Sequence, residues 1–149
     1  MELKIETATI THIDKLYRIE EACFDQEAFT KRQIAYLLTD YNSIALLAKA
    51  NNVIAGFIIT QIDIDEYSQF GHIITINVPP NYRRRHVATA LIRETERILK
   101  EKGIKECRLE VREDNHAAQK LYQTLGYQIT GKLDNYYGKK HGLHLKKSL

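Results

Sequence analysis

The sequence predicts an α/β domain, in its mixed α+β form, with a mixed central sheet of about seven strands and four flanking helices. Strand-like apolar segments are interspersed with segments whose apolar residues recur every three or four positions, in the order β-α-α-β-β-β-α-β-α-β-β. This order favours helices packed on a sheet with parallel and antiparallel neighbours. A chain of 149 residues without repeats, linkers or low-complexity segments is expected to form a single domain over residues 1–149.

The composition is that of a folded protein without a membrane segment. Hydrophobic residues make up 44% and charged residues 28%, enough apolar mass to offset the entropy lost on folding, which argues against disorder. No apolar run approaches the roughly 20 residues of a membrane span. The N-terminus lacks the apolar core of a signal peptide. We therefore expect a cytoplasmic protein without a membrane partner.

Charge and metal-ligand content argue against two further classes of function. A net charge of +3 is too small for nucleic acid to be the main partner. Cys23 and Cys107 lie far apart and form no CxxC motif, so we interpret both as small buried residues. His141 and His144 lack a third ligand, and we predict no metal site.

The N-terminal part is predicted to be one strand followed by two helices. Leu3–Glu6 alternates as a strand does, and Ile10 and Tyr17 belong to a helical face with Thr11 as the expected N-cap. A second helix begins at Thr30, because Thr30-Lys31-Arg32-Gln33 has the form of a capping box.

Three strands follow. Ser43–Ala50 and Val53–Ile64 are joined by Asn51-Asn52, a pair that tolerates the positive φ of a tight hairpin turn. Gln69–Val78 is the third strand, and Pro79-Pro80 ends it because proline has no N–H to donate to a sheet.

The C-terminal half is predicted to begin with a helix over His86–Lys102, closed by Gly103. The remaining elements are a strand, a helix with Asn115 as its cap, and two closing strands: Ile104–Arg112, Asn115–Leu125, Tyr127–Leu133 and Leu143–Lys147.

A basic turn, Arg83-Arg84-Arg85, joins the strand that ends at Val78 to the helix that follows. Backbone N–H groups at a helix start have no intrahelical partner and, with the helix dipole, attract anions. Arginines would add charge-assisted hydrogen bonds to a phosphate. On composition alone, a solvated basic loop before an ordinary helix is the simpler explanation, because three arginines are a weak signal.

Two longer motifs change that interpretation. Arg83–Ala88 resembles motif A of the GCN5-related N-acetyltransferases, Arg/Gln-x-x-Gly-x-Gly/Ala, and Leu109–Tyr127 is similar to motif B, "LEVR..N..A..LY..LGY". With Asn135-Tyr136-Tyr137, the chain resembles the RimI-like branch, the ribosomal-protein-alanine type that acetylates protein N-termini. The resemblance implies acetyl-CoA as cosubstrate, no metal, and a protein or peptide N-terminus as partner, possibly that of a ribosomal protein. We expect a monomer or a homodimer.

The resemblance also implies a set of cofactor-binding residues. The pyrophosphate would lie on backbone N–H groups of the turn, and the end of the preceding strand would contact the pantetheine arm. The Val78 N–H would polarise the thioester carbonyl. His86 stands where the family has glycine; it keeps its N–H, and the replacement bears on the shape of the turn and on CoA affinity. The full set is Ile76, Asn77, Val78, Arg84, Arg85, His86, Val87, Ala88, Thr89 and Asn115, the last also a candidate N-cap.

Two residues are candidates for proton transfer. By resemblance, Glu110 would accept a proton from the amine, directly or through water. The alternative role of Glu110 is structural: its carboxylate would form an ion pair with Arg108 or Arg112 on the strand. By resemblance, Tyr122 would donate a proton to the departing thiolate. The alternative is that Tyr122 is an aromatic residue of the core with no catalytic role.

Phe29, Tyr136 and Tyr137 are the expected acceptor-binding residues. Two tyrosines resemble the pair that lines the peptide entrance in N-terminal acetyltransferases, although packing in a loop would also account for them. An α-amine, with a pKa near 7.7–8.0, is far more often neutral at cell pH than a lysine amine, so a modest base suffices.

Three other functions compete with this one. The same fold could acetylate a small amine, or it could bind acyl-CoA without turnover, as His86 in the phosphate turn suggests. Nucleic-acid binding through Arg83-Arg84-Arg85 is disfavoured, because the arginines lack interleaved aromatic residues and a wider basic face.

Overall fold

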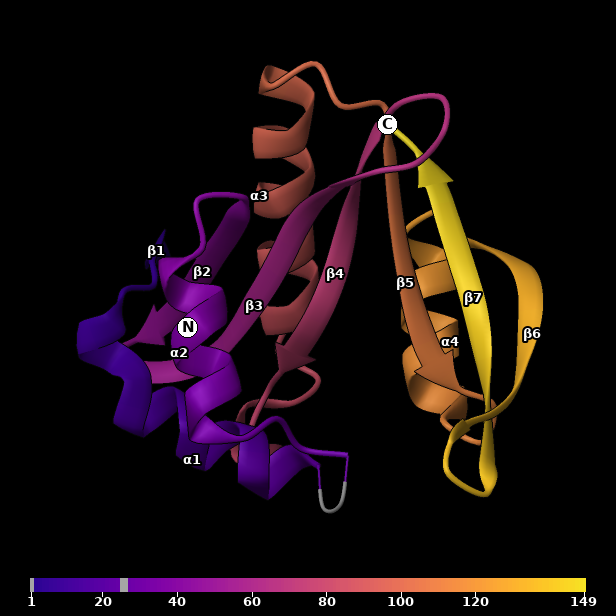
Figure 1. Ribbon diagram of the computed structural model, residues 1–149. Helices are drawn as coiled ribbons and strands as arrows, with labels where there is room; N and C mark the ends of the chain where they lie inside the picture. Colours follow the sequence, from indigo (N-terminus) through magenta and orange to yellow (C-terminus); the bar gives the residue numbers. More distant parts are fainter. Residues whose placement is uncertain (1, 25–26) are drawn as a thin grey trace.

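Seven strands form one continuous sheet in the computed structural model, which describes residues 2–24 and 27–149 (Figure 1). The strands are β1 (Leu3–Thr7), β2 (Ser43–Ala50), β3 (Val53–Ile64), β4 (Gln69–Asn77), β5 (Glu106–Arg112), β6 (Gln128–Tyr137) and β7 (Lys140–Ser148). The α-helices are α1 (Ile13–Cys23), α2 (Lys31–Thr39), α3 (Val87–Glu101) and α4 (His116–Thr124), with short 3₁₀ turns at Ile10–His12 and Pro80–Tyr82.

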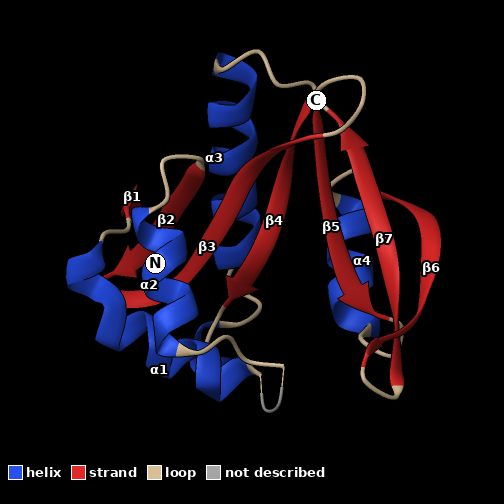
Figure 2. Ribbon diagram, in the orientation of Figure 1, coloured by secondary structure: helices blue, strands red, loops and turns tan. Residues whose placement is uncertain are grey.

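The strand order is β1-β2-β3-β4-β5-β7-β6, and every neighbouring pair is antiparallel except β4 and β5. Helices α1 and α2 cover one face of the sheet, and α3 and α4 cover the other (Figure 2). The predicted fold class, element order and mixed sheet are therefore confirmed. Within the described residues, no helix is long and apolar enough to cross a membrane.

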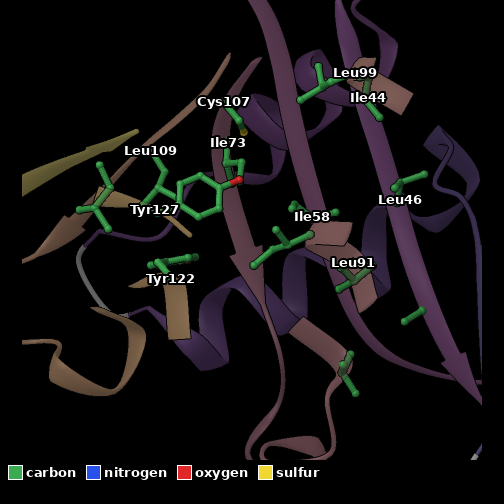
Figure 3. Packing of buried hydrophobic residues seen from close by; sticks show 14 of the residues in the cluster. Ile44, Leu46, Ile58, Ile73, Leu91, Leu99, Cys107, Leu109, Tyr122 and Tyr127 are labelled. Carbon is green, nitrogen blue, oxygen red and sulfur yellow. The ribbon is translucent and has the colours of Figure 1, made fainter. Parts of the chain in front are cut away.

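Each face of the sheet has its own apolar core. On the α1–α2 face, Leu16 and Ile34 pack on strand residues such as Phe57. The core on the α3–α4 face is larger, and Figure 3 shows Leu91 of α3 on one side and Tyr122 of α4 on the other. The two cores hold the helices against opposite faces of one sheet.

The parallel contact between β4 and β5 is short. Their register contains two residue pairs, Gly71 with Cys107 and His72 with Arg108. One residue further along, the β3–β4 ladder shifts register, and Ile74 is left opposite no residue of β3. A bulge of this kind bends and twists the strand. Past it, β4 and β5 separate widely (Figure 1).

Several local predictions are confirmed by the backbone. Thr30 and Gln33 form the predicted capping box at the start of α2, with Gln33 N donating to Thr30 Oγ1 at 3.1 Å. Asn51 and Asn52 both adopt positive φ, 51° and 64°, in the turn between β2 and β3. Short-range chemistry therefore sets these two boundaries.

Two local predictions are wrong. Thr11 is not a helix N-cap: it lies inside a 3₁₀ turn, and α1 begins at Ile13. The buried residues of α1 are Leu16 and Glu20, whereas Ile10, expected on the packed face, is exposed. The other error concerns β6, which runs on past the predicted end at Leu133, because its last residue, Tyr137, pairs with Lys140 of β7.

Gly56 allows a close approach between β3, the end of β4 and the start of α3. A Cβ atom at this position would lie 2.8 Å from the Asn77 carbonyl oxygen and 3.0 Å from Val87 Cγ1. The first of these distances is shorter than side chains tolerate, and the neighbour is backbone, which cannot rotate away. Glycine is therefore required for this packing.

We predict that Gly56→Ala destabilises the protein by about 1–3 kcal/mol, the usual effect of overpacking a core. Gly131→Ala in β6 is the matched control, because a Cβ there would meet only His144 Cβ, at 4.0 Å. The control should lie within about 0.5 kcal/mol of the parent protein. Urea denaturation of the three proteins measures both values, and equal stability of the two variants would contradict the close approach.

Candidate active site

A cavity of about 250 Å³ occupies the gap between the separating strands β4 and β5. It is lined from both faces of the sheet: α1 and the segment after it contribute on one side, and α4 on the other. Its walls are Glu20, Phe24, Glu27, Phe29, Ile73, Ile74, Thr75, Ile76, Leu109, Glu110, Val111, Arg112, Asn115, Ala118, Tyr122, Tyr136 and Tyr137.

Seven of the predicted site residues are among these walls. They are Phe29, Ile76, Glu110, Asn115, Tyr122, Tyr136 and Tyr137. The other predicted residues lie where the cavity meets the β4–α3 connection: Asn77 and Val78 at the end of β4, and Arg84, Arg85, His86, Val87, Ala88 and Thr89 in the turn and first helical turn. The structure thus groups the predicted residues into a cavity and an adjoining turn.

Glu110 is held by imidazoles. Leu109 and Val111 point into the core, so the alternation of β5 directs Glu110 to the opposite face. Its Oε1 lies 2.6 Å from His72 Nε2, and its Oε2 lies 3.6 Å from His144 Nε2. A carboxylate can only accept hydrogen bonds, so His72 donates in the short contact when Glu110 is ionised.

The alternative interpretation of Glu110, an ion pair with a neighbouring arginine, is wrong. Arg108 pairs with Asp65 and Glu106. Arg112 pairs with Glu27 and Asp114, each at 2.9 Å. Both arginines are therefore engaged away from Glu110, which instead interacts with His72, His144 and Tyr136.

Sequence reasoning missed His72 and considered His144 only as half of an incomplete metal-ligand pair. His144 is opposite Glu110 in the antiparallel β5–β7 register. Burial lowers the pKa of His144, so this imidazole tends to stay neutral, and its Nδ1 lies 2.8 Å from Thr130 Oγ1. Alternation along each strand could have shown which face each side chain takes. The strand pairing that brings His72, Glu110 and His144 together cannot be read from any one segment of the sequence.

Tyr122 lies on the α4 side of the cavity. Only 6% of it is exposed, and its ring makes an edge-on contact with Tyr127, with centroids 6.0 Å apart. Burial raises the pKa of the Tyr122 hydroxyl above its ordinary value, so the group is protonated at neutral pH. The residue is both a core aromatic and a hydroxyl at the cavity wall, and its two interpretations are compatible.

The start of α3 has the geometry of an anion site. The first α3 hydrogen bond runs from Ala90 N to His86 O, so the N–H groups of Val87, Ala88 and Thr89 precede the helical ladder. Among the described residues, no side chain caps this end. His86 has φ 63° and ψ 19°, and a left-handed residue before a right-handed helix turns successive N–H groups to one side.

Side chains around this turn have structural roles. Arg83 Nε donates to the Val78 carbonyl at 2.9 Å and ties the turn to the end of β4. The Val87 side chain is buried in the core, so only its backbone is available to a ligand.

Asn115 caps the start of α4. Its Oδ1 accepts from Ala118 N at 3.1 Å, which confirms its N-cap role and leaves the amide NH₂ for another partner.

Three aromatic residues predicted to bind the acceptor line the cavity. The rings of Tyr136 and Tyr137 meet edge to face, with centroids 4.9 Å apart, and both belong to β6. Burial and the nearby Glu110 carboxylate raise the pKa of Tyr136. Phe29 borders the cavity from the connection between α1 and α2. These two tyrosines and one phenylalanine lie with Glu110 on the walls of one cavity.

Comparisons with known proteins identify the class. The model of the acetyltransferase (GNAT) family matches residues 13–127. This chain therefore belongs to the acetyltransferase (GNAT) family, and the expected class of enzyme, an N-acetyltransferase, is confirmed.

Particular relatives are similar over most of the chain. A putative [ribosomal protein bS18]-alanine N-acetyltransferase of Bacillus subtilis is 31% identical over 134 residues, covering 89% of this chain and 85% of the relative. An N-alpha-acetyltransferase of Sulfurisphaera tokodaii is 27% identical over 145 residues, covering 91% and 86%. The solved ribosomal-protein-S18-alanine N-acetyltransferase of Escherichia coli has the same fold, with a TM-score of 0.88 at 24% identity over 99% of this chain and 94% of that chain.

The cosubstrate of this family is acetyl-CoA, and the residues present fit it. The uncapped first turn of α3, with its left-handed His86, offers N–H donors and the positive end of a helix dipole to a pyrophosphate. The segment of β4 beyond His72 has separated from β5, so its edge borders the cavity instead of a neighbouring strand. An extended amide-containing arm can lie along such an edge.

We predict that His86→Gly is about 1 kcal/mol more stable than His86→Ala, because only glycine adopts positive φ without steric penalty. Alanine is the matched control, since it also removes the imidazole but keeps the strain. Thermal unfolding with and without CoA measures both stability and binding, because a ligand of the folded state raises Tm. If the two variants melt together, the left-handed turn is not present in solution.

Proposed function

We propose that this chain transfers the acetyl group of acetyl-CoA to the free α-amine at the N-terminus of a protein or peptide. The observation that carries the proposal is that Glu110 and Tyr122, from opposite faces of the sheet, line one cavity together with the paired rings of Tyr136 and Tyr137. The names of two relatives support it: one is a putative [ribosomal protein bS18]-alanine N-acetyltransferase and the other is an N-alpha-acetyltransferase. A ribosomal protein is therefore one candidate acceptor.

We assign Glu110 as the general base of the reaction. With Oε1 held by His72 at 2.6 Å, the Glu110 carboxylate would accept the proton that the amine nitrogen loses as it attacks, directly or through water. A neutral His144 adds no competing positive charge beside it. Only a modest base is required, because the pKa of an α-amine, near 7.7–8.0, is close to cell pH.

We assign Tyr122 as the general acid of the reaction. Acetyl-CoA supplies a thioester carbonyl, the carbon that the amine attacks. We assign the Val78 N–H, just after β4, to donate to the oxygen of that carbonyl, as the family resemblance implies. The Tyr122 hydroxyl, kept protonated by burial, gives its proton to the departing sulfur. Proton acceptor and donor thus occupy opposite faces of the sheet and act through the gap between β4 and β5.

Two environments support this division of roles. The hydrogen bond from His72 orients the Glu110 carboxylate, whereas the buried Tyr122 phenol resists losing its proton until a strong base forms beside it. We further propose a cytoplasmic location. Cys23 and Cys107 are free thiols, which fits a reducing compartment.

The acceptor is tested with peptides. We expect acetylation of short peptides that begin with alanine or serine and have a free N-terminus, and little acetylation of N-terminally blocked peptides that contain lysine. The reasons are the lower pKa of the α-amine and the tyrosine-lined cavity, which suits an extended backbone. Mass spectrometry locates the acetyl group. Preferential modification of the internal lysine, or of small amines such as polyamines, would overturn the assignment.

We predict that Tyr122→Phe lowers kcat by about 10–10³-fold and leaves the fold intact, because one hydroxyl proton donor is lost and the ring is kept. Tyr127→Phe is the matched control: the Tyr127 hydroxyl donates to Glu96 at 2.8 Å and lies outside the cavity walls. The control should lose about 1–3 kcal/mol of stability and keep kcat. Steady-state rates and urea denaturation separate the two effects. Unchanged kcat in Tyr122→Phe would remove this residue from the mechanism.

A further inference from the structure

Glu20 is a buried carboxylate in the cavity wall that the proposed mechanism does not use. It lies on α1, on the face that packs against the sheet, and only 1% of it is exposed. Its Oε1 accepts from Thr75 Oγ1 at 2.8 Å and from Asn77 Nδ2 at 2.9 Å, and its Oε2 accepts from Phe29 N at 3.2 Å. Charged side chains are rarely buried to this extent unless they are bonded in this way.

These three hydrogen bonds connect two walls of the cavity. Thr75 and Asn77 are alternate residues of β4, so their side chains share the face that α1 covers. Phe29 lies in the connection from α1 to α2. A single carboxylate therefore fixes the distance between β4, the strand proposed to hold the thioester, and the aromatic wall proposed to receive the acceptor.

Phe29 also separates two hollows. It borders the cavity between β4 and β5, and it borders a second hollow of about 490 Å³ whose other walls include Tyr36 and Leu37 of α2. Ile74 of β4, the bulged residue, is likewise shared by both. A small shift of Phe29 toward the second hollow would enlarge the space beside Glu110.

If this network served only to pack α1 against β4, burying a carboxylate would be less favourable than burying apolar side chains. Burial raises the pKa of Glu20, with the three hydrogen bonds opposing that effect. The network also directs Asn77 Nδ2 to Glu20 and Thr75, and Asn77 Oδ1 is left without a partner among the described residues. Apolar side chains of similar volume would avoid both penalties. What the carboxylate adds is a defined position for the Phe29 backbone.

We propose that Glu20 is a positioning residue that sets acceptor selectivity: its carboxylate fixes Phe29 relative to β4 and so limits the size of the first side chain that the cavity accepts. This proposal rests on the proposed N-terminal acetyltransferase function. It assigns Glu20 no contact with the reacting atoms.

Glu20→Gln tests the proposal, because glutamine has one acceptor oxygen where glutamate has two. If that oxygen keeps the Thr75 and Asn77 bonds, the amide NH₂ faces the Phe29 N–H, and the hydrogen bond to Phe29 is lost. We expect amide hydrogen exchange at Phe29 to accelerate by about tenfold, as loss of a hydrogen bond to a charged acceptor implies. We also expect the kcat/KM ratio between peptides beginning with alanine and with leucine to fall by about fivefold to tenfold. The KM for acetyl-CoA should change less than about twofold.

Thr75→Val is the matched control. It removes one donor from the β4 side of the carboxylate and leaves the Phe29 N–H bond in place. Exchange at Phe29 and the alanine-to-leucine ratio should both remain those of the parent protein. A second variant, Phe29→Leu, should lower the ratio in the same direction with Glu20 intact, which keeps the test valid if Glu20→Gln fails to fold.

The results separate this proposal from the proposed function. If the parent protein acetylates no peptide N-terminus, the proposed function fails, while exchange at Phe29 still reports whether Glu20 holds that backbone. If the parent protein acetylates peptides and Glu20→Gln leaves the ratio unchanged, the positioning role alone is overturned. An equal loss of selectivity in Thr75→Val would also overturn it, because the network would then be a structural support without a specific action on Phe29.

Discussion

The separation of β4 from β5 is the feature on which the site depends. Parallel pairing stops after Gly71–Cys107 and His72–Arg108, and the bulge at Ile74 follows at once. A sheet that stayed paired would place a continuous hydrogen-bonded layer between the α1–α2 face and the α3–α4 face. Because it opens, side chains from both faces line one cavity, and one edge of β4 borders that cavity. The first turn of α3, the Tyr136–Tyr137 pair and the two residues proposed for proton transfer are all arranged around this opening.

The electrostatics of the site follow from which face each group occupies. Glu110 lies on the face of β5 opposite the α3–α4 core, where His72 and His144 are within reach. Tyr122 packs in the core beside Tyr127, and burial raises its pKa. A buried phenol and a carboxylate oriented by an imidazole therefore line one cavity from opposite faces of the sheet.

Much of the fold could be predicted from the sequence because local chemistry determines it. The capping box at Thr30 and the Asn51-Asn52 turn are short-range features, and both have the predicted geometry. The resemblance of Leu109–Tyr127 to a family motif predicted that Glu110 and Tyr122 would share a site, and both line the same cavity.

The remaining features depend on contacts between distant segments. His72 meets Glu110 only through the β4–β5 register, and the bulge that ends this register has no local signal. Glu20 escaped notice because a glutamate on an amphipathic helix is normally solvated; it is buried because Thr75, Asn77 and Phe29 supply its hydrogen bonds. The length of β6 was underestimated because the pairing of Tyr137 with Lys140 sets its end.

The most direct test of this account is a crystal structure of the protein with a conjugate in which CoA is joined to the α-amine of a short peptide. The account predicts the pyrophosphate on the N–H groups of Val87, Ala88 and Thr89 and the linker between β4 and β5, with the peptide leaving between Phe29 and Tyr137. Density for the conjugate that lies on one face of the sheet and does not enter the gap between β4 and β5 would contradict it.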